Sequence, residues 1–218
     1  MTIFICGDST AATYAPESAP MHGWGQLLGE FLPGVSIVNA ARGGRSTKSF
    51  LSEGWLQEIE RALMPGDLVL IQFGHNDGSD LVWRHTDAFT SYWNNLSIFV
   101  DTARLAGARP VLLTPICRRY FRDGRLTPTH GDFPEAVRLL AAERSVPLID
   151  MHAMSWAHVE ALGDEASRPL YMHVEPGIYP YFPEGCIDNT HTQRAGAEVW
   201  ARMVAQELIR LGLVPKEE

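Results

Sequence analysis

The sequence has little cysteine. Its three cysteines lie far apart, at Cys6, Cys117 and Cys186. An odd number at wide spacing gives neither a disulfide framework nor the paired cysteines of a zinc site. Cys6 lies inside an apolar run, where a thiol usually serves as a small buried side chain. The cysteines therefore predict neither cross-links nor a metal site.

Clustered positive charge is also absent. The chain has 18 lysines and arginines against 26 acidic residues, which gives a formal net charge of −8, and no basic run interrupts it. Because affinity for nucleic acids depends largely on clustered cations, the sequence predicts no nucleic-acid partner.

Long hydrophobic runs are missing as well. No stretch is long enough to span a bilayer, and residues 1–6 lead directly into a predicted strand without the basic and apolar regions of a signal peptide. We therefore expect a cytoplasmic protein with no membrane partner. With 218 residues, 45% of them hydrophobic and 20% charged, residues 1–218 fit one globular domain. The sequence leaves the oligomeric state open.

Short apolar runs alternate with longer amphipathic stretches, which is typical of βα units around a parallel sheet. The predicted strands are Thr2–Cys6, Val35–Asn39, Leu68–Phe73, Pro110–Thr114 and Pro147–Ile149. The predicted helices are Trp24–Phe31, Trp55–Leu63, Asp87–Ala106, Pro134–Arg144 and Thr192–Leu211. The sequence thus predicts an α/β fold.

One segment, Leu162–Gly185, shows no clear periodicity. Its four prolines argue against regular structure, and its aromatic residues argue against disorder. A loop of this length in a compact domain is usually functional. Its role is left open.

Polar residues follow the predicted strands where a parallel sheet binds its ligands, at the carboxyl ends. Gly7–Thr10, Asn39–Ser46 and Gly74–Asp77 come after the first three strands, and Asp188–Thr192 precedes the last helix. These four segments are the candidate site.

Ser9, Asp188 and His191 are the residue types of a nucleophile, its orienting acid and its base. A serine needs a general base, imidazole titrates in the useful range, and a carboxylate can fix the ring tautomer. A turn entering a helix would let Asp188 reach back to His191, three residues on. The alternatives are that Asp8–Thr10 caps a short helix and that Asp188 caps the last one beside a surface histidine.

Two further groups could stabilise a developing negative charge. Asn76 offers a side-chain amide and Gly44 a backbone N–H, beside the N–H of Ser9. The alternatives are a turn with positive φ at Gly43-Gly44 and, around Asn76, an Asx turn or a metal site. His75, Asp77, Asp188 and His191 could act as ligands, but no paired ligand spacing is present, so no metal is predicted.

Together these segments resemble the SGNH (GDSL-like) hydrolases, whose four sequence blocks occur here in family order. Ser9 lies in Gly7-Asp8-Ser9, Gly44 in Gly43-Gly44-Arg45-Ser46, Asn76 in Gly74-His75-Asn76-Asp77, and His191 follows Asp188. The blocks span residues 7 to 191, nearly the whole chain. Their details are similar to the rhamnogalacturonan acetylesterase branch.

The resemblance implies a three-layer α/β/α, flavodoxin-like sandwich around a five-stranded parallel sheet. It also implies that Ser9 is the nucleophile, His191 the base and Asp188 its orienting partner. The oxyanion hole would comprise the amides of Ser9 and Gly44 and the side chain of Asn76. No cofactor is implied, and the expected reaction is removal of acetyl groups from pectin-derived oligosaccharides.

Aromatic and cationic side chains near the predicted site suit an acidic sugar. The candidate substrate contacts are Trp83, Tyr120, Tyr171 and Tyr179, with Tyr181 and the arginines Arg84, Arg118 and Arg119. The alternative is that many of these aromatics pack under the long loop. Two other functions stay open: a short-chain lipase or acyl-thioesterase of the same superfamily, and a non-catalytic carbohydrate-binding protein.

Overall fold

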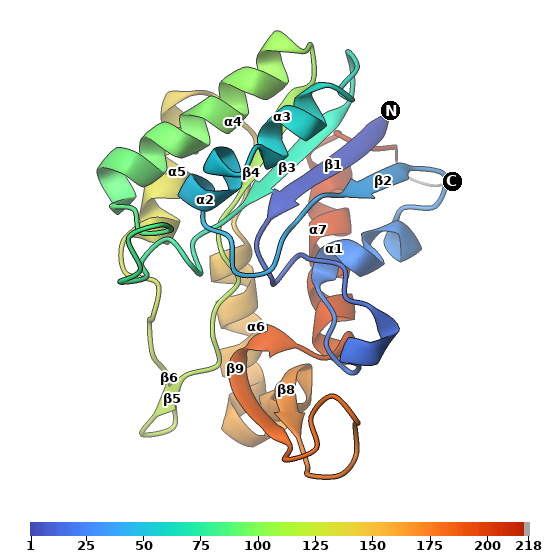
Figure 1. Cartoon of the computed structure of the whole chain (residues 1–218), viewed down its shortest axis with the longest axis vertical. Coiled ribbons are helices and arrows are strands. Elements are labelled where there is room, and N and C mark those ends of the chain that lie inside the picture. Colours follow the sequence, from blue (N-terminus) through green and yellow to red (C-terminus); the bar gives the residue numbers. More distant parts are fainter. Residues whose placement is uncertain (216–218) are drawn as a thin grey trace.

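A five-stranded parallel sheet forms the centre of the computed structural model, which describes residues 1–215 (Figure 1). Its strands, in sheet order, are β2 (Ser36–Asn39), β1 (Thr2–Gly7), β3 (Leu68–Gln72), β4 (Arg109–Leu113) and β7 (Leu148–Ile149). Each predicted strand is confirmed to within one residue at either end. The α/β fold with a five-stranded parallel sheet is therefore confirmed.

Both faces of the sheet are covered. In β1, Ile3 and Ile5 face one hydrophobic cluster, whereas Phe4 and Cys6 face the other, because successive side chains point to opposite faces. This double burial explains why the strands are continuous apolar runs. Figure 1 shows the resulting layers. One face carries α2 (Thr47–Ser52), α3 (Trp55–Glu60), α4 (Trp93–Leu105) and α5 (Phe133–Glu143), and the other carries α1 (Trp24–Leu27), α6 (Met151–Ser167) and α7 (Arg194–Arg210).

The expected helices are present, most of them shorter than predicted. The observed α-helices are α1 (Trp24–Leu27), α2 (Thr47–Ser52), α3 (Trp55–Glu60), α4 (Trp93–Leu105), α5 (Phe133–Glu143), α6 (Met151–Ser167) and α7 (Arg194–Arg210). A 3-10 turn, Leu28–Phe31, extends α1, and a π-helical turn, Ala88–Tyr92, precedes α4. No helix within residues 1–215 is both long and apolar enough to cross a membrane.

Helices α2 and α6 were not predicted. The buried residues of α6 include Met151, Ser155 and Val159, which follow helical spacing, but the serine interrupts the apolar stripe. Its hydroxyl is satisfied inside the fold, where it accepts a hydrogen bond from the backbone N–H of Cys117 at 2.8 Å. A hydrophobic pattern alone does not reveal such a helix.

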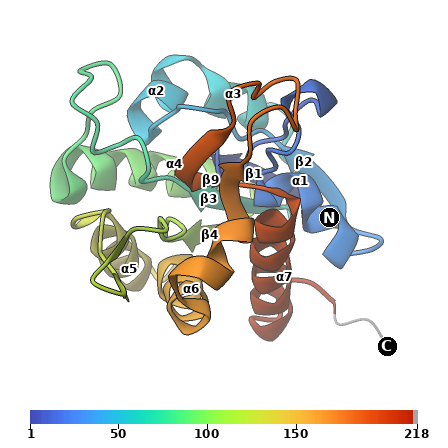
Figure 2. The same cartoon turned by 90° about the horizontal axis from the view of Figure 1, so that it is seen from below.

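The expectation of an irregular segment over Leu162–Gly185 is wrong for its first half. The segment contains the end of α6, a 3-10 turn and strand β8 (Tyr171–Val174), which pairs with β9 (Cys186–Thr192). Figure 2 shows this antiparallel hairpin lying across the end of the sheet. A second small hairpin joins β5 (Phe121–Arg122) to β6 (Arg125–Leu126).

Candidate active site

Ser9 lies in the turn that follows β1. Its side chain is almost buried, with 7% of the residue exposed, and Tyr14 donates a hydrogen bond to its carbonyl oxygen at 2.8 Å. Asp8 holds the turn by accepting hydrogen bonds from the backbone N–H and hydroxyl of Thr10, at 2.9 and 2.8 Å. No helix begins at Ser9, contrary to one of the expectations.

Gly7 lies where neighbouring atoms leave little room for a side chain. A Cβ atom there would lie 3.0 Å from the carbonyl oxygen of Gln72 and 3.2 Å from the Cβ of Ala11. The close approach of β1 to β3 and to its own turn therefore favours glycine. The turn leaves the Ser9 hydroxyl at the edge of the sheet.

His191 and Asp188 come from strand β9, not from a turn entering a helix as expected. Nδ1 of His191 lies 2.6 Å from Oδ2 of Asp188, and its Nε2 lies 2.8 Å from Oγ of Ser9. Oδ1 of Asp188 accepts hydrogen bonds from the backbone N–H groups of Thr190 and His191, at 2.7 and 3.1 Å. The β8–β9 hairpin thus carries the imidazole to a serine 182 residues away.

Asp188 and His191 each stabilise the charged form of the other. Burial raises the pKa of Asp188, but the hydrogen bond and charge of His191 outweigh it and bring that pKa to about 2. Burial lowers the pKa of His191, but Asp188 outweighs it and raises that pKa above 6.5. The arrangement can draw a proton from a hydroxyl because a fixed carboxylate stabilises the imidazolium that forms.

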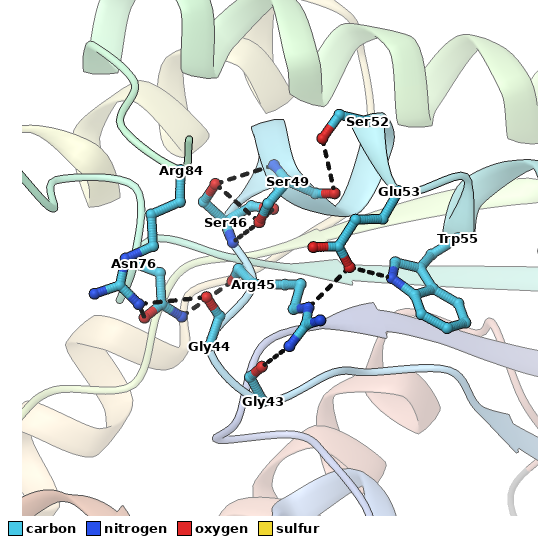
Figure 3. Close-up of polar contacts among 10 residues, drawn as sticks. All are labelled: Gly43, Gly44, Arg45, Ser46, Ser49, Ser52, Glu53, Trp55, Asn76 and Arg84. Atoms are coloured by element: carbon cyan, nitrogen blue, oxygen red, sulfur yellow. Dashed lines mark hydrogen bonds and ion pairs between the residues drawn. The ribbon is translucent and has the colours of Figure 1, made fainter. Parts of the chain in front are cut away.

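The loop Gly43–Ser46 brings backbone N–H groups to the same place. A Cβ atom on Gly43 would lie 4.0 Å from the Cβ of Ser9, and Gly44 has a φ of +75°. A reciprocal pair of hydrogen bonds between Ser46 and Ser49 caps α2 and fixes the end of the loop (Figure 3). The positive φ that was considered for this loop is therefore present at Gly44, and the loop also lies beside Ser9.

Asn76 is tied to this loop by its side chain. Its Nδ2 donates to the carbonyl oxygen of Arg45 at 3.0 Å, and its Oδ1 accepts from Arg84 at 3.2 Å (Figure 3). The second N–H of this amide has no acceptor within residues 1–215. The backbone N–H groups of Ser9 and Gly44 also have no acceptor within residues 1–215. These are three N–H groups without acceptors, and donors of this kind can stabilise an oxyanion.

Asp77 has a structural role in the site that was not predicted from the sequence. Its Oδ1 accepts from the backbone N–H and hydroxyl of Thr47, at 2.9 and 2.6 Å, and so links the Asn76 segment to the start of α2. Burial raises the pKa of Asp77 to about 7, despite these hydrogen bonds. The only feature of the sequence that indicated this role is the position of Asp77 directly after Asn76.

The candidate substrate contacts divide into two groups. Trp83 and Tyr120 are half exposed, at 49% and 52%, and Tyr179 is partly buried. The prediction that Tyr171 contacts the substrate is wrong. Its side chain is fully buried and donates a hydrogen bond to the carbonyl oxygen of Cys117 at 2.9 Å, so it packs inside the fold.

The expectation that Arg119 contacts an acidic sugar is wrong for the same reason. It is buried and binds Asp164, Ser167 and Asn189, so it holds the β8–β9 region and not a ligand. In the described part of the chain, no three histidine, cysteine or acidic side chains are grouped to hold a metal ion.

Comparison with known proteins gives consistent matches. The model of the GDSL-like lipase/acylhydrolase family matches residues 5–199. Rhamnogalacturonan acetylesterase RhgT of Bacillus subtilis is 43% identical over 99% of this chain and 92% of its own. The crystal structure of YxiM from Bacillus subtilis superposes with a TM-score of 0.82 at 28% identity, covering 97% of this chain and 56% of that one. That of Axe2, an acetylxylan esterase from Geobacillus stearothermophilus, gives 0.70 at 17% identity, covering 99% and 97%.

Proposed function

The chain belongs to the GDSL-like lipase/acylhydrolase family, and on that premise we propose that it is a serine esterase that removes acetyl groups from rhamnogalacturonan-derived oligosaccharides. The similarity to RhgT, which extends over 99% of the chain, is the observation that carries the substrate class. The contacts of Ser9 and Asp188 with His191 support the reaction type.

In the first half of the proposed reaction, the hydroxyl of Ser9 attacks the carbonyl carbon of the acetyl ester. His191 takes the hydroxyl proton at Nε2 and delivers it to the departing sugar oxygen, which leaves an acetyl group on Ser9. Asp188 keeps Nδ1 protonated, so that Nε2 is the nitrogen that accepts.

In the second half, water attacks the acetyl-enzyme. Nε2 of His191 removes a proton from the water and returns it to the oxygen of Ser9, and acetate leaves. In both halves the carbonyl oxygen becomes negative. We assign its stabilisation to the N–H groups of Ser9 and Gly44 and to the free amide N–H of Asn76. These steps require no cofactor.

Two further expectations also stay predictions from the sequence alone. They are the organisation of residues 1–218 as a single domain and the cytoplasmic location. Cell fractionation of the native host, with the protein followed by immunoblot, would test the location. Limited proteolysis would test the domain: one stable fragment is expected.

Acetate release from acetylated rhamnogalacturonan oligosaccharides tests the function, with Ser9→Ala as the control. Acetylated xylan and a series of p-nitrophenyl esters of increasing chain length are run beside it. We expect acetate from the rhamnogalacturonan substrate, only a small residual rate from the variant, and a steep loss of rate beyond acetyl in the ester series. A preference for long acyl chains would instead indicate a lipase or acyl-thioesterase.

A further inference from the structure

A pocket of about 430 Å³ lies beside Asn76 and is not explained by the proposed reaction steps. Three stretches of chain line it: the loop that follows β3, the residues after β4, and the start of α5. The lining residues are Gly74, His75, Gly78, Ser79, Arg84, Arg118, Thr129, His130, Gly131 and Phe133. Its volume lies in the range of ligand sites. We call it the arginine pocket.

The charge of the arginine pocket is of one sign. Arg84 and Arg118 line it, and no acidic residue does. Neither arginine forms an ion pair with any residue in the described range 1–215. Two arginines without an ion pair in one pocket contrast with the net charge of −8 of the whole chain. They indicate an anionic ligand.

Both guanidinium groups are held by neutral oxygens. Arg118 donates to the carbonyl oxygens of Thr129 and His75, at 3.1 and 2.9 Å. Arg84 donates to Oδ1 of Asn76, and its buried Nε has no acceptor in the part of the chain that the structure describes. A buried donor without a partner costs about 1–3 kcal/mol. Each guanidinium keeps further N–H groups that can bind a ligand.

Two histidines complete the pocket without adding charge. Nε2 of His130 lies 3.2 Å from Nδ1 of His75, so one ring donates to the other. Burial, and then the neighbouring charge of Arg118 among other groups, lowers the pKa of both rings well below 6.5. The positive charge therefore comes from the arginines alone. In the neutral pair, one remaining ring nitrogen is a donor and the other an acceptor.

The pocket also borders the candidate oxyanion hole. Arg84 contacts the side chain of Asn76, and Arg118 contacts the carbonyl of the residue before it. A ligand group bound by both arginines would therefore lie next to the acetyl group that Ser9 attacks. The volume is larger than a carboxylate needs, and the ring of Phe133 lines it, which suits a sugar ring carrying the charge.

We propose that the arginine pocket binds the carboxylate of a hexuronic acid residue in the oligosaccharide whose acetyl group is removed at Ser9. This inference rests on the proposed function for the identity of the substrate. Arg118 and Arg84 both supply N–H groups to the carboxylate, in the forked geometry that guanidinium groups offer.

Titration calorimetry with a deacetylated hexuronate oligosaccharide tests the pocket without requiring hydrolysis. We expect Arg118→Gln to weaken binding by about tenfold or more, the scale of charge-assisted hydrogen bonds. The matched control is Arg61→Gln, which removes the same charge from an exposed position on the surface. It should change the affinity by less than about twofold, because exposed charges contribute little. Equal losses in both variants would overturn the proposal.

A change in the ligand avoids any effect of the substitution on folding. An oligosaccharide whose carboxylates are reduced to hydroxymethyl groups should bind the unmodified protein about tenfold more weakly or worse. Arg118→Gln should distinguish the two ligands less than the unmodified protein does, because only Arg84 remains to bind the carboxylate. If the unmodified protein binds both equally, or binds neither, the pocket is not a carboxylate site.

Acetate release separates this proposal from the proposed function. If carboxylate-dependent binding is found but acetylated oligosaccharides are not hydrolysed, the esterase assignment fails and the pocket stands. If hydrolysis occurs with the same kcat/KM for the carboxylate and reduced substrates, the pocket proposal fails and the esterase assignment stands.

Discussion

Asp188→Asn should inactivate the protein while leaving its fold intact. Oδ1 of Asp188 accepts two backbone N–H groups, from Thr190 and His191, and Oδ2 faces Nδ1 of the His191 ring. An asparagine can satisfy the backbone only by placing its carbonyl oxygen in the Oδ1 position. Its NH₂ group must then face the ring nitrogen.

That NH₂ group donates to Nδ1 and so places the imidazole proton on Nε2. In this tautomer Nε2 cannot accept a proton from Ser9, which lies 2.8 Å away. The equivalent change in a serine protease triad lowers kcat by about 10⁴-fold, which is about 5.4 kcal/mol, and we expect a loss of that size here. The stability should change little, because the backbone hydrogen bonds persist.

The pH dependence should change as well. The carboxylate of Asp188 raises the pKa of His191 above 6.5, against burial and the charge of Arg118, which lower it. His191 must be neutral to act, so activity falls as the pH drops through this pKa. Without the carboxylate, the pKa of His191 falls, so the acid limb of kcat/KM should move to lower pH.

The assay is hydrolysis of p-nitrophenyl acetate over a pH series, with circular dichroism to confirm folding. Asp188→Ala is the companion variant: it loses the carboxylate but puts no donor against Nδ1. It should therefore be at least as active as Asp188→Asn. An Asp188→Asn protein that keeps activity within about tenfold of the original would refute the orienting role.

Three other predictions follow from the site. Asn76→Ala should lower kcat by about 10²–10³-fold with a much smaller change in KM, as loss of one oxyanion donor does; steady-state kinetics would decide. Ser9→Ala, His191→Ala and the double variant should all show nearly the same residual rate, since these residues act as a unit, and additive losses would contradict this. Burial raises the pKa of Asp77 from 3.8 to about 7 in the folded protein. Between these two pH values only the unfolded chain loses the proton, so the free energy of unfolding falls as the pH rises. Asp77→Asn should therefore gain stability relative to the original protein from about pH 4 to about pH 8 in urea unfolding, and a constant difference would contradict the buried ionisation.

Much of this architecture could be predicted because the strands leave a local signal. Strands such as β1 and β3 are buried on both faces, so they are short, continuous apolar runs bounded by Gly, Pro or Asp. The order of the polar segments after them indicated which residues would meet. The meeting of the segments that carry Ser9, Gly44 and Asn76 follows from that topology, since parallel strands end at one edge of the sheet. His191 instead reaches Ser9 from the antiparallel strand β9.

The failures share a physical cause, which is that the deciding contacts are distant in sequence. Strand β8 exists because it pairs with β9, and neither strand has a distinctive pattern alone. Tyr171 and Arg119 have side chains that suit a sugar site, but each finds a buried partner elsewhere in the chain. Residue type indicates what a side chain can do, whereas burial decides whether a ligand can reach it.

Covalent labelling tests the central claim most directly. The protein is treated with a fluorophosphonate, and the modified residue is located by peptide mass spectrometry. The account predicts a single adduct on Ser9, formed rapidly in the original protein, slowly in His191→Ala and not at all in Ser9→Ala. An adduct on another residue, together with acetyl-ester hydrolysis that survives in Ser9→Ala, would contradict it.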